Sequence, residues 1–347
     1  MHTSIDFVRH AMKRYCIAAW CLSGILLIPS LSLAGDYSGR ADVKAFIQKM
    51  VKEHQFDEAQ LTSWLDSAEK KPAILDAIAR PAEKEKTWKE YRAIFLTEER
   101  INMGVQFWKD NARSLDAISK QYGVPPEMII AILGVETRYG RNTGTYRVID
   151  ALATLGFDYP PRGKFFLSQL EEFFLLAREQ HHDPLELKGS YAGAMGYGQF
   201  IPSSYRHFAV DFNGDHFADI WNTPDDAIAS VANYFKENGW QDGKLVIVRC
   251  RIRDNYDASV LELGLKPVLR RSELEAKGFS PVEPSSPDEL FAIYKLDGEY
   301  GAEFWAGAKN FYVITRYNQS NMYALAAYQL GQAIKERYQN PILNWGD

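Results

Sequence analysis

Cysteine is scarce in this chain, which has three in 347 residues. Cys16 and Cys21 lie in an apolar N-terminal stretch, so removal of that stretch would leave Cys250 alone. This scarcity excludes a disulfide-stapled scaffold, and the chain has no Cys–His cluster for a structural zinc ion. The size of the hydrophobic core must therefore supply the stability. Cys250 lies in an alternating apolar stretch, LVIVRCRIR, which favours a buried structural thiol over a nucleophile.

An excess of positive charge is also missing. The chain has 40 Lys and Arg against 45 Asp and Glu, a net charge of −5. This balance argues against a protein that binds nucleic acid through bulk positive charge. Internal repeats and a Gly-x-Ser-x-Gly nucleophile elbow are absent, so a serine esterase is not supported. With 46% hydrophobic and 24% charged residues, the composition is that of a globular protein of two or three domains.

Long apolar runs are limited to residues 15–34, which read YCIAAWCLSGILLIPSLSLA. The run follows Lys13 and Arg14 and ends in small residues, which is the pattern of a secretory signal peptide cleaved after Ala34. A membrane anchor is the alternative, but Pro29 and the serines leave the uninterrupted part short for a span. No cysteine follows small residues at the cleavage point, so a lipid anchor is not supported. We therefore expect residues 1–34 to be a cleaved signal and the mature protein to be exported.

The rest of the chain divides by periodicity into four parts. Residues 36–120 have apolar positions at steps of three and four, which predicts a helical domain. Residues 121–243 are richer in glycine and in motifs, residues 244–315 alternate as short strands do, and residues 316–347 return to a helical period. The predicted fold class is α+β and mainly helical, with a motif-bearing core and a small β domain.

Glu136 is the first candidate for chemistry. In the stretch VPPEMIIAILGVET (residues 124–137), prolines at the start suit the first turn of a helix, and Ile129, Ile132 and Leu133 form one apolar stripe. Glu136 lies seven, four and three residues after these positions, so a helix places its carboxyl at the edge of the buried face. Desolvation would raise the pKa of such a carboxyl, as a general acid requires. A structural ion pair with Arg138 or Arg141 is the alternative.

A glycine-rich segment, SYAGAMGYGQFIP (residues 190–202), is the second candidate. Its glycines allow backbone to approach a ligand closely. Tyr191, Tyr197 and Phe200 offer flat apolar surface, and the Gln199 amide can hydrogen-bond hydroxyl or acetamido groups. A tight turn packed by its own aromatic residues is the alternative.

An acidic segment, DFNGDHFADIWNTPDD (residues 211–226), resembles a calcium loop, in which alternate residues ligate through side-chain oxygens and the seventh through its carbonyl. The loop is longer than twelve residues, and His216 stands where glycine is usual. A plain acidic turn is the alternative. The candidate ligands are Asp211, Asn213, Asp215, the carbonyl of Phe217, and Asp225 or Asp226 as the closing carboxylate, of which we favour Asp226.

Four ordered motifs give the chain a resemblance to a known family. They are GVETRYG (residues 134–140), SYAGAMGYGQFIPSSY (190–205), DFNGD with WNTPDDAIASVANYF (211–235) and RYNQSNMY (316–323). Together they resemble the lytic murein transglycosylase B family, glycoside hydrolase family 103, from about residue 40 to residue 340.

The resemblance implies a fold and an activity. The fold is a lysozyme-like core with a helical domain and a small β domain. The activity is cleavage of the β-1,4 bond between N-acetylmuramic acid and N-acetylglucosamine in peptidoglycan, with a 1,6-anhydro-N-acetylmuramic acid product. The substrate would be peptidoglycan glycan strands. The predicted signal peptide adds a periplasmic location, and the charge balance argues against nucleic acid as a ligand. We expect a monomer, with cell-wall synthesis and remodelling proteins as candidate partners.

The resemblance also assigns roles to residues. Glu136 would be the single acid/base, Ser190 and Gln199 would contact sugar, and the 211–226 segment would hold a structural calcium, with no cofactor needed for the chemistry. The cleft would be lined by Tyr234, Tyr317, Asn318 and Tyr323.

Three hypotheses for the function follow. In the first, Glu136 protonates the leaving oxygen, the substrate's acetamido group assists at C1, and the C6 hydroxyl closes the anhydro ring. The second is a muramidase in which Asp150 or Asp158 orients a water nucleophile. The third is an inactive peptidoglycan-binding protein that retains the groove.

Overall fold

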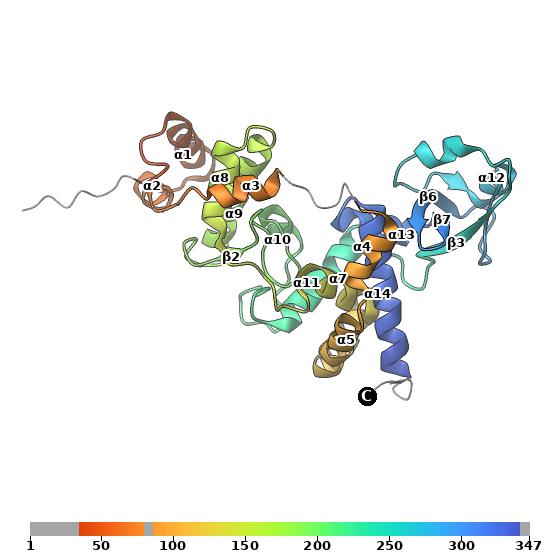
Figure 1. Ribbon diagram of the computed structural model, residues 1–347. Coiled ribbons are helices and arrows are strands. Elements are labelled where there is room, and N and C mark those ends of the chain that lie inside the picture. Colours follow the sequence, from red (N-terminus) through yellow and green to blue (C-terminus); the bar gives the residue numbers. More distant parts are fainter. Residues whose placement is uncertain (1–34, 80–85, 341–347) are drawn as a thin grey trace, which may run out of the picture. The chain divides into compact units, whose positions relative to one another are not determined.

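The computed structural model describes residues 35–79 and 86–340 (Figure 1). The predicted signal peptide, residues 1–34, lies outside the described residues. The predicted fold class is confirmed, since helices dominate and one five-stranded sheet forms the β domain.

One hydrophobic core joins the first helices to a later helix pair. The side chain of Asp57 accepts the Gln60 N–H at 2.7 Å and so caps the N-terminus of α2. In Figure 1, α8 and α9 lie side by side, and α3 packs on α8. The helices of this first core are α1 (Ala41–His54), α2 (Glu58–Asp66), α3 (Pro72–Ile78), α8 (Val148–Asp158), α9 (Gly163–Glu179) and α10 (Pro202–Phe208).

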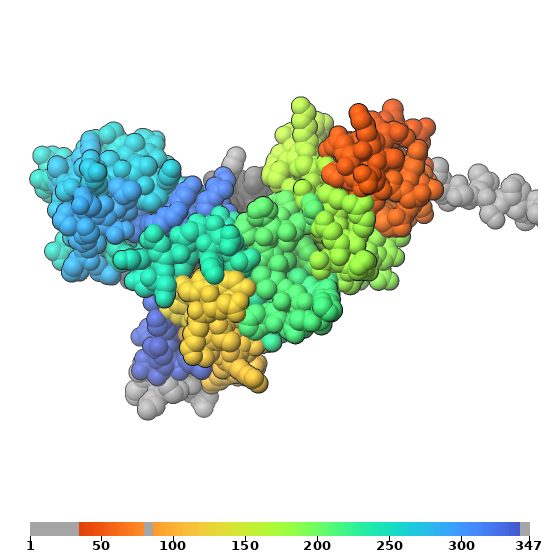
Figure 2. Space-filling view, turned by 180° about the vertical axis from the view of Figure 1, so that it is seen from behind, coloured from red at the N-terminus to blue at the C-terminus, as the bar shows by residue number. Residues whose placement is uncertain are grey.

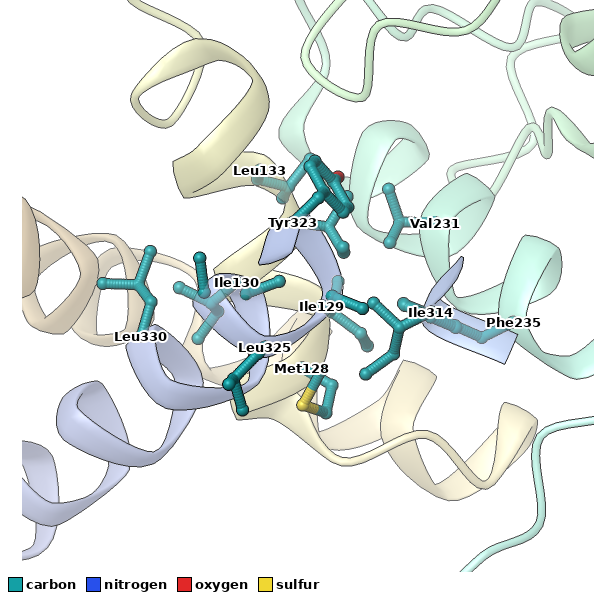
Figure 3. Packing of buried hydrophobic residues seen from close by; sticks show 14 of the residues in the cluster. Met128, Ile129, Ile130, Leu133, Val231, Phe235, Ile314, Tyr323, Leu325 and Leu330 are labelled. Carbon is teal, nitrogen blue, oxygen red and sulfur yellow. The ribbon is translucent and has the colours of Figure 1, made fainter. Parts of the chain in front are cut away.

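A second core surrounds α7 (Pro126–Thr137), which is buried along most of its length. Pro126 occupies the first helical position, as predicted, where its missing N–H costs no hydrogen bond. Figure 3 shows Ile129, Ile130 and Leu133 of this helix among apolar side chains of three other helices. The helices around α7 are α4 (Trp88–Phe95), α5 (Glu98–Asp110), α6 (Ala112–Tyr122), α11 (Pro224–Glu237), α13 (Lys309–Tyr317) and α14 (Asn321–Gln339).

The two cores divide the stretch 36–120 that the periodicity predicts as one helical domain. Helices α1 to α3 belong to the first core, whereas α4 to α6 belong to the second. Figure 2 shows one seam of the second core, where the yellow surface of α6 meets the green-teal surface of α11. The domain boundaries themselves remain a prediction, since the described residues form one compact unit.

The β domain is an antiparallel sheet with strand order β4-β6-β7-β3-β5. The hairpin of its two longest strands turns at Gly298 and Gly301, and Gly301 has φ +112°. Its strands are β3 (Ile247–Ile252), β4 (Leu269–Arg270), β5 (Phe279–Pro281), β6 (Leu290–Gly298) and β7 (Gly301–Gly307). The sheet also carries two short helices, η2 (Ala258–Glu262) and α12 (Arg271–Ala276), that the alternation does not indicate.

Cys250 lies on β3 and is half-buried. Burial raises the pKa of its thiol to about 12, so the group is protonated near neutral pH and unsuited to nucleophilic chemistry. The expectation of an inert structural thiol agrees with this environment.

Candidate active site

Glu136 sits at the C-terminal end of α7 and is half-buried. The hydroxyl of Tyr323, at the start of α14, donates a hydrogen bond of 2.5 Å to its Oε1. Arg138, which the sequence offers as a structural partner, directs its guanidinium to Glu99 of α5. Burial of the apolar stripe of α7 therefore places the Glu136 carboxyl next to the hydroxyl of Tyr323, although 187 residues separate the two in the sequence.

Burial is the main reason why the pKa of Tyr323 lies well above its usual value, and the nearby Glu136 charge raises it further. The phenol therefore keeps its proton and donates a hydrogen bond to the carboxylate across the physiological range. Burial and then Glu136 likewise raise the pKa of Tyr317 well above normal, which places this ring in the electrostatic field of the same carboxylate.

A cluster of aromatic rings adjoins this pair. The rings of Tyr234 and Tyr317 have centroids 4.7 Å apart, and Phe200 packs 5.9 and 6.0 Å from them. The Tyr317 hydroxyl donates to the Gly198 carbonyl at 2.5 Å, and the Tyr234 hydroxyl donates to the Arg316 carbonyl at 2.6 Å. Phe200 is only 3% exposed, so we revise its role from ligand contact to support of the two tyrosines.

Tyr91 is a residue of this site that the sequence reasoning missed. It lies on α4, is buried, and is close enough to Tyr323 for its charge to contribute to the raised pKa of that phenol. Its ring packs against Phe95 at 5.2 Å. Nothing in the local sequence TWKEYRAIF distinguishes Tyr91 from an ordinary core tyrosine, because its proximity to Tyr323 is created by the packing of α4 on α14.

The glycine-rich segment is a compact loop that follows β2 (Lys188–Gly189), which pairs with β1 (Tyr146–Arg147). The Ser190 Oγ accepts the N–H groups of Ala192 and Ala194, at 3.3 and 3.1 Å. Gln199 has φ +51°, and its Nε2 donates to the carbonyls of Thr143 and Gly196. The Gln199 amide nitrogen is thus engaged by backbone, and its oxygen is the atom available to a ligand.

The remaining predicted cleft residues differ in position. Tyr197 is half-buried, and its ring packs directly on Gly140 in the segment after α7. A Cβ added at Gly140 would lie 1.8 Å from this ring, so only glycine fits there. Tyr191 is 41% exposed and lies outside the ring cluster. Asn318 is half-buried and directly follows Tyr317 at the end of α13. Contacts of these residues with a glycan remain predictions.

Asp150 and Asp158, the candidate second carboxylates, are both engaged in ion pairs. Asp150 is 1% exposed, receives two hydrogen bonds from Arg147 at 2.7 and 2.9 Å, and accepts the Glu69 N–H. Asp158 pairs with Arg40 and Lys70 at 3.0 and 3.1 Å. Both lie on α8, in the first core, whereas Glu136 extends from the second.

The acidic segment forms a loop closed by its own hydrogen bonds. Asp211 accepts the N–H groups of Gly214, Asp215 and His216 at 2.7 to 3.2 Å. Asp226 is fully buried and accepts the N–H groups of Phe212 and Asp219, both at 2.9 Å. Burial raises the pKa of the Asp226 carboxyl.

This loop holds oxygen donors of the kind that calcium prefers. Among residues 35–79 and 86–340, the group of three acidic or histidine side chains close enough to share an ion is Glu53, His54 and Glu171. The ammonium of Lys49 already pairs with Glu171 there, so we interpret that group as an ion-pair cluster.

The comparisons with known proteins decide the family. Residues 38–332 match the family described as Transglycosylase SLT domain. The chain belongs to this family. It is 43% identical over 323 residues to membrane-bound lytic murein transglycosylase B of Escherichia coli (strain K12), covering 90% of this chain and 88% of that one. The predicted family and the prediction of a peptidoglycan lytic transglycosylase are confirmed.

Solved structures of the family share the fold. Catenated lytic transglycosylase SltB1 from Pseudomonas aeruginosa is 50% identical, with a TM-score of 0.85 over 87% of this chain and 100% of that one. Slt35 of Escherichia coli, solved in complex with calcium and with bulgecin A, is 44% identical with a TM-score of 0.81 over 88% of this chain and 96% of that one. SltB3 from Pseudomonas aeruginosa, solved with NAG-anhNAM-pentapeptide, is 30% identical with a TM-score of 0.76 over 84% and 78%.

The family relatives include a membrane-bound enzyme. Within residues 35–79 and 86–340, no helix combines the length and the apolar character needed to cross a bilayer.

Proposed function

We propose that this transglycosylase cleaves the β-1,4 bond between N-acetylmuramic acid and N-acetylglucosamine with Glu136 as its single acid/base. The observation that carries the proposal is the 2.5 Å hydrogen bond from Tyr323 to Glu136 at the end of the buried helix α7. A half-buried carboxyl that accepts a hydrogen bond from a fixed tyrosine is oriented toward a bound glycan, as proton transfer requires. The half-buried Tyr317 beside it offers aromatic surface for a sugar ring, and the buried Tyr234 and Phe200 pack behind Tyr317 as support.

The chemistry balances without water. Glu136 gives its proton to the glycosidic oxygen, and the N-acetylglucosamine leaves with that proton. The acetamido oxygen of the N-acetylmuramic acid attacks C1 as the bond breaks, which gives an oxazolinium intermediate. The Glu136 carboxylate then removes the proton from the C6 hydroxyl, and O6 displaces the acetamido oxygen at C1. The 1,6-anhydro ring forms and Glu136 is protonated again.

The positions of Asp150 and Asp158 argue against the muramidase alternative. A water nucleophile requires a second carboxylate across the scissile bond from the acid. Both aspartates are instead engaged by arginine or lysine side chains in the first core. Substrate assistance needs no second carboxylate and so agrees better with this arrangement.

Glu136→Gln tests the assignment. We expect the variant to bind glycan strands and to release no soluble muropeptides from sacculi, because the amide cannot donate an acid proton. Glu127→Gln is the matched control, since Glu127 lies at the other end of the same helix and pairs with Lys335. Mass spectrometry of the wild-type products distinguishes the reactions, because a hydrolase product carries one more water than an anhydro product. Cleavage by Glu136→Gln would overturn the assignment, and binding of sacculi without cleavage by the wild type would favour the inactive binding protein.

We further propose that the loop of residues 211–226 binds a structural calcium ion. Asp211, Asn213 and Asp215 supply side-chain oxygens at alternate positions, and the structure of the relative Slt35 in complex with calcium supports the proposal. Asp226 is already used as a buried acceptor for two backbone N–H groups. The half-exposed Asp225 is therefore the alternative closing ligand.

We propose that the enzyme is exported to the periplasm. Export by cleavage after Ala34 would place the enzyme in the periplasm beside its peptidoglycan substrate. N-terminal sequencing of the protein recovered from the periplasm tests the cleavage site, and an uncleaved chain found in the membrane fraction would contradict it. A monomer that works with cell-wall synthesis and remodelling proteins remains our expectation.

A further inference from the structure

The residue that follows the acid has an unusual set of contacts. Thr137 is fully buried, although its side chain carries a hydroxyl. The Oγ1 of Thr137 donates to the Tyr197 carbonyl at 2.8 Å and accepts the N–H of Gly140 at 2.9 Å. It also lies 3.2 Å from the Leu133 carbonyl in its own helix. One hydroxyl therefore links the end of α7, the turn that follows it and the glycine-rich loop.

The turn after Thr137 is strained. Arg138 and Tyr139 have φ values of +52° and +62°, a conformation that costs free energy for residues other than glycine. Such a conformation persists only where surrounding contacts enforce it. The bond from Gly140 to the Thr137 hydroxyl and the bond from the Tyr139 hydroxyl to the Arg100 carbonyl, at 2.8 Å, both hold the turn.

The Thr137 contact also connects the acid to the tyrosine cluster. Tyr197 is followed by Gly198, whose carbonyl receives the Tyr317 hydroxyl at 2.5 Å. Glu136 is therefore connected to Tyr317 through its neighbour Thr137, the hydrogen bond from Thr137 to Tyr197, and the hydrogen bond from Tyr317 to Gly198, the neighbour of Tyr197. A change in the Thr137 bond would shift the carboxyl relative to the loop and to the ring cluster.

We propose that Thr137 is a positioning residue that fixes the distance between the Glu136 carboxyl and the glycine-rich loop. It touches no substrate and acts through the backbone of its neighbours. The proposal rests on the role of Glu136 as acid/base given above. Loss of the hydroxyl leaves the Gly140 N–H and the Tyr197 carbonyl without their buried partner, so the strained turn relaxes and the acid moves.

Thr137→Val removes the hydroxyl at nearly constant volume. We expect kcat on soluble muroglycan to fall about 10- to 100-fold, since small displacements of a reacting group have effects of this size. Glycan affinity, measured in the Glu136→Gln background, should change less than about twofold because the sugar-contacting side chains remain. Thr154→Val is the matched control, because Thr154 is equally buried and accepts the Lys71 N–H at 3.0 Å, but lies in the first core. Its kcat should remain at the wild-type level.

A second pair of variants separates the hydroxyl from the packing. Thr137→Ser and Thr137→Ala both lack the methyl group and differ only in the hydroxyl. Thr137→Ser should retain most of the wild-type kcat, and Thr137→Ala should match the loss in Thr137→Val. Equal kcat in the Ser and Ala variants, or full activity of folded Thr137→Val, would overturn the positioning role. A wild type that forms no anhydro product would instead refute the proposed function, so the two failures are distinguishable.

Discussion

At the scale of single residues, the contact between Tyr323 and Glu136 is the one that defines the site. Burial and the nearby carboxylate raise the pKa of the Tyr323 phenol above its usual value. The hydroxyl therefore stays protonated and donates its hydrogen to Oε1 of Glu136. The sequence spacing could not predict that these two residues are in contact, because 187 residues separate them. The sequence predicts Glu136 from its place on an apolar helix and Tyr323 from a motif.

Tyr323→Phe tests the value of this donor. We expect kcat to fall about tenfold, the equivalent of about 1.4 kcal/mol, which lies near the worth of a hydrogen bond to a charged group. The melting temperature should change little, since the ring remains packed. Tyr328→Phe on the same helix is the control and should keep wild-type kcat. Steady-state kinetics on soluble muroglycan measures both, and an unchanged kcat in Tyr323→Phe would remove the tyrosine from the mechanism.

At the scale of elements, helix α13 shows what local patterns leave open. Most of the stretch KNFYVITRY, residues 309–315, lies in the range 244–315 that we predict to be strand-rich, yet residues 309–317 form a helix. Its β-branched Val313, Ile314 and Thr315 favour strand locally. Burial of Phe311 and Ile314 against the second core overrides that preference. Pro126, by contrast, begins α7 as predicted, because the preference of proline for the first turn of a helix depends only on the local backbone.

Calcium binding by the loop of residues 211–226 should be measurable as a change in melting temperature. Addition of calcium should raise the melting temperature and EGTA should lower it, because a ligand at 100 times its dissociation constant stabilises the native state by about 2.7 kcal/mol. Asp215→Asn should weaken this response, since it removes one charged ligand. Asp254→Asn, an exposed aspartate in the β domain, should leave the response intact. Differential scanning calorimetry with and without EGTA measures the shift, and identical melting in both conditions would support a plain acidic turn.

At the scale of the whole molecule, the N-terminal helices are attached to the rest of the first core partly through Glu171. This residue of α9 bonds to His54 of α1 at 2.6 Å and pairs with Lys49. Burial alone would raise the pKa of Glu171, but the pairs with Lys49 and His54 outweigh it and lower that pKa below its usual value. A lowered pKa means that the ionised form stabilises the fold, and this contribution is lost as the pH falls through the folded-state pKa.

Glu171→Gln should therefore lower the free energy of unfolding more near neutral pH than at about pH 3, because the stabilisation by the wild-type carboxylate is lost as the pH falls through its lowered folded-state pKa. Urea unfolding at the two pH values measures the difference. Glu53→Gln is the control, because Glu53 is half-exposed and 3.9 Å from Lys49, and it should change stability little at either pH. A destabilisation by Glu171→Gln that is equal at both pH values would show that packing, rather than charge, accounts for the role of Glu171.

The sequence by itself determined the features that depend on neighbours along the chain. These include the mainly helical class, the strands after residue 244, the start of α7 at its prolines, and the placement of Glu136 at the edge of an apolar helix face. The motifs determined the family. Each of these follows from local periodicity, backbone propensity or a contiguous run of residues.

Only the tertiary structure decided which of these residues meet. It brought Tyr323 and Tyr91 to the site, withdrew Phe200 into the core, engaged Asp150 and Asp158 in ion pairs, and divided residues 36–120 between two cores. Periodicity shows that a helix has a buried face, but the partner of that face is chosen by packing over the whole chain. The hydroxyl of Thr137, which reads as an ordinary helical residue, acquires its contacts for the same reason.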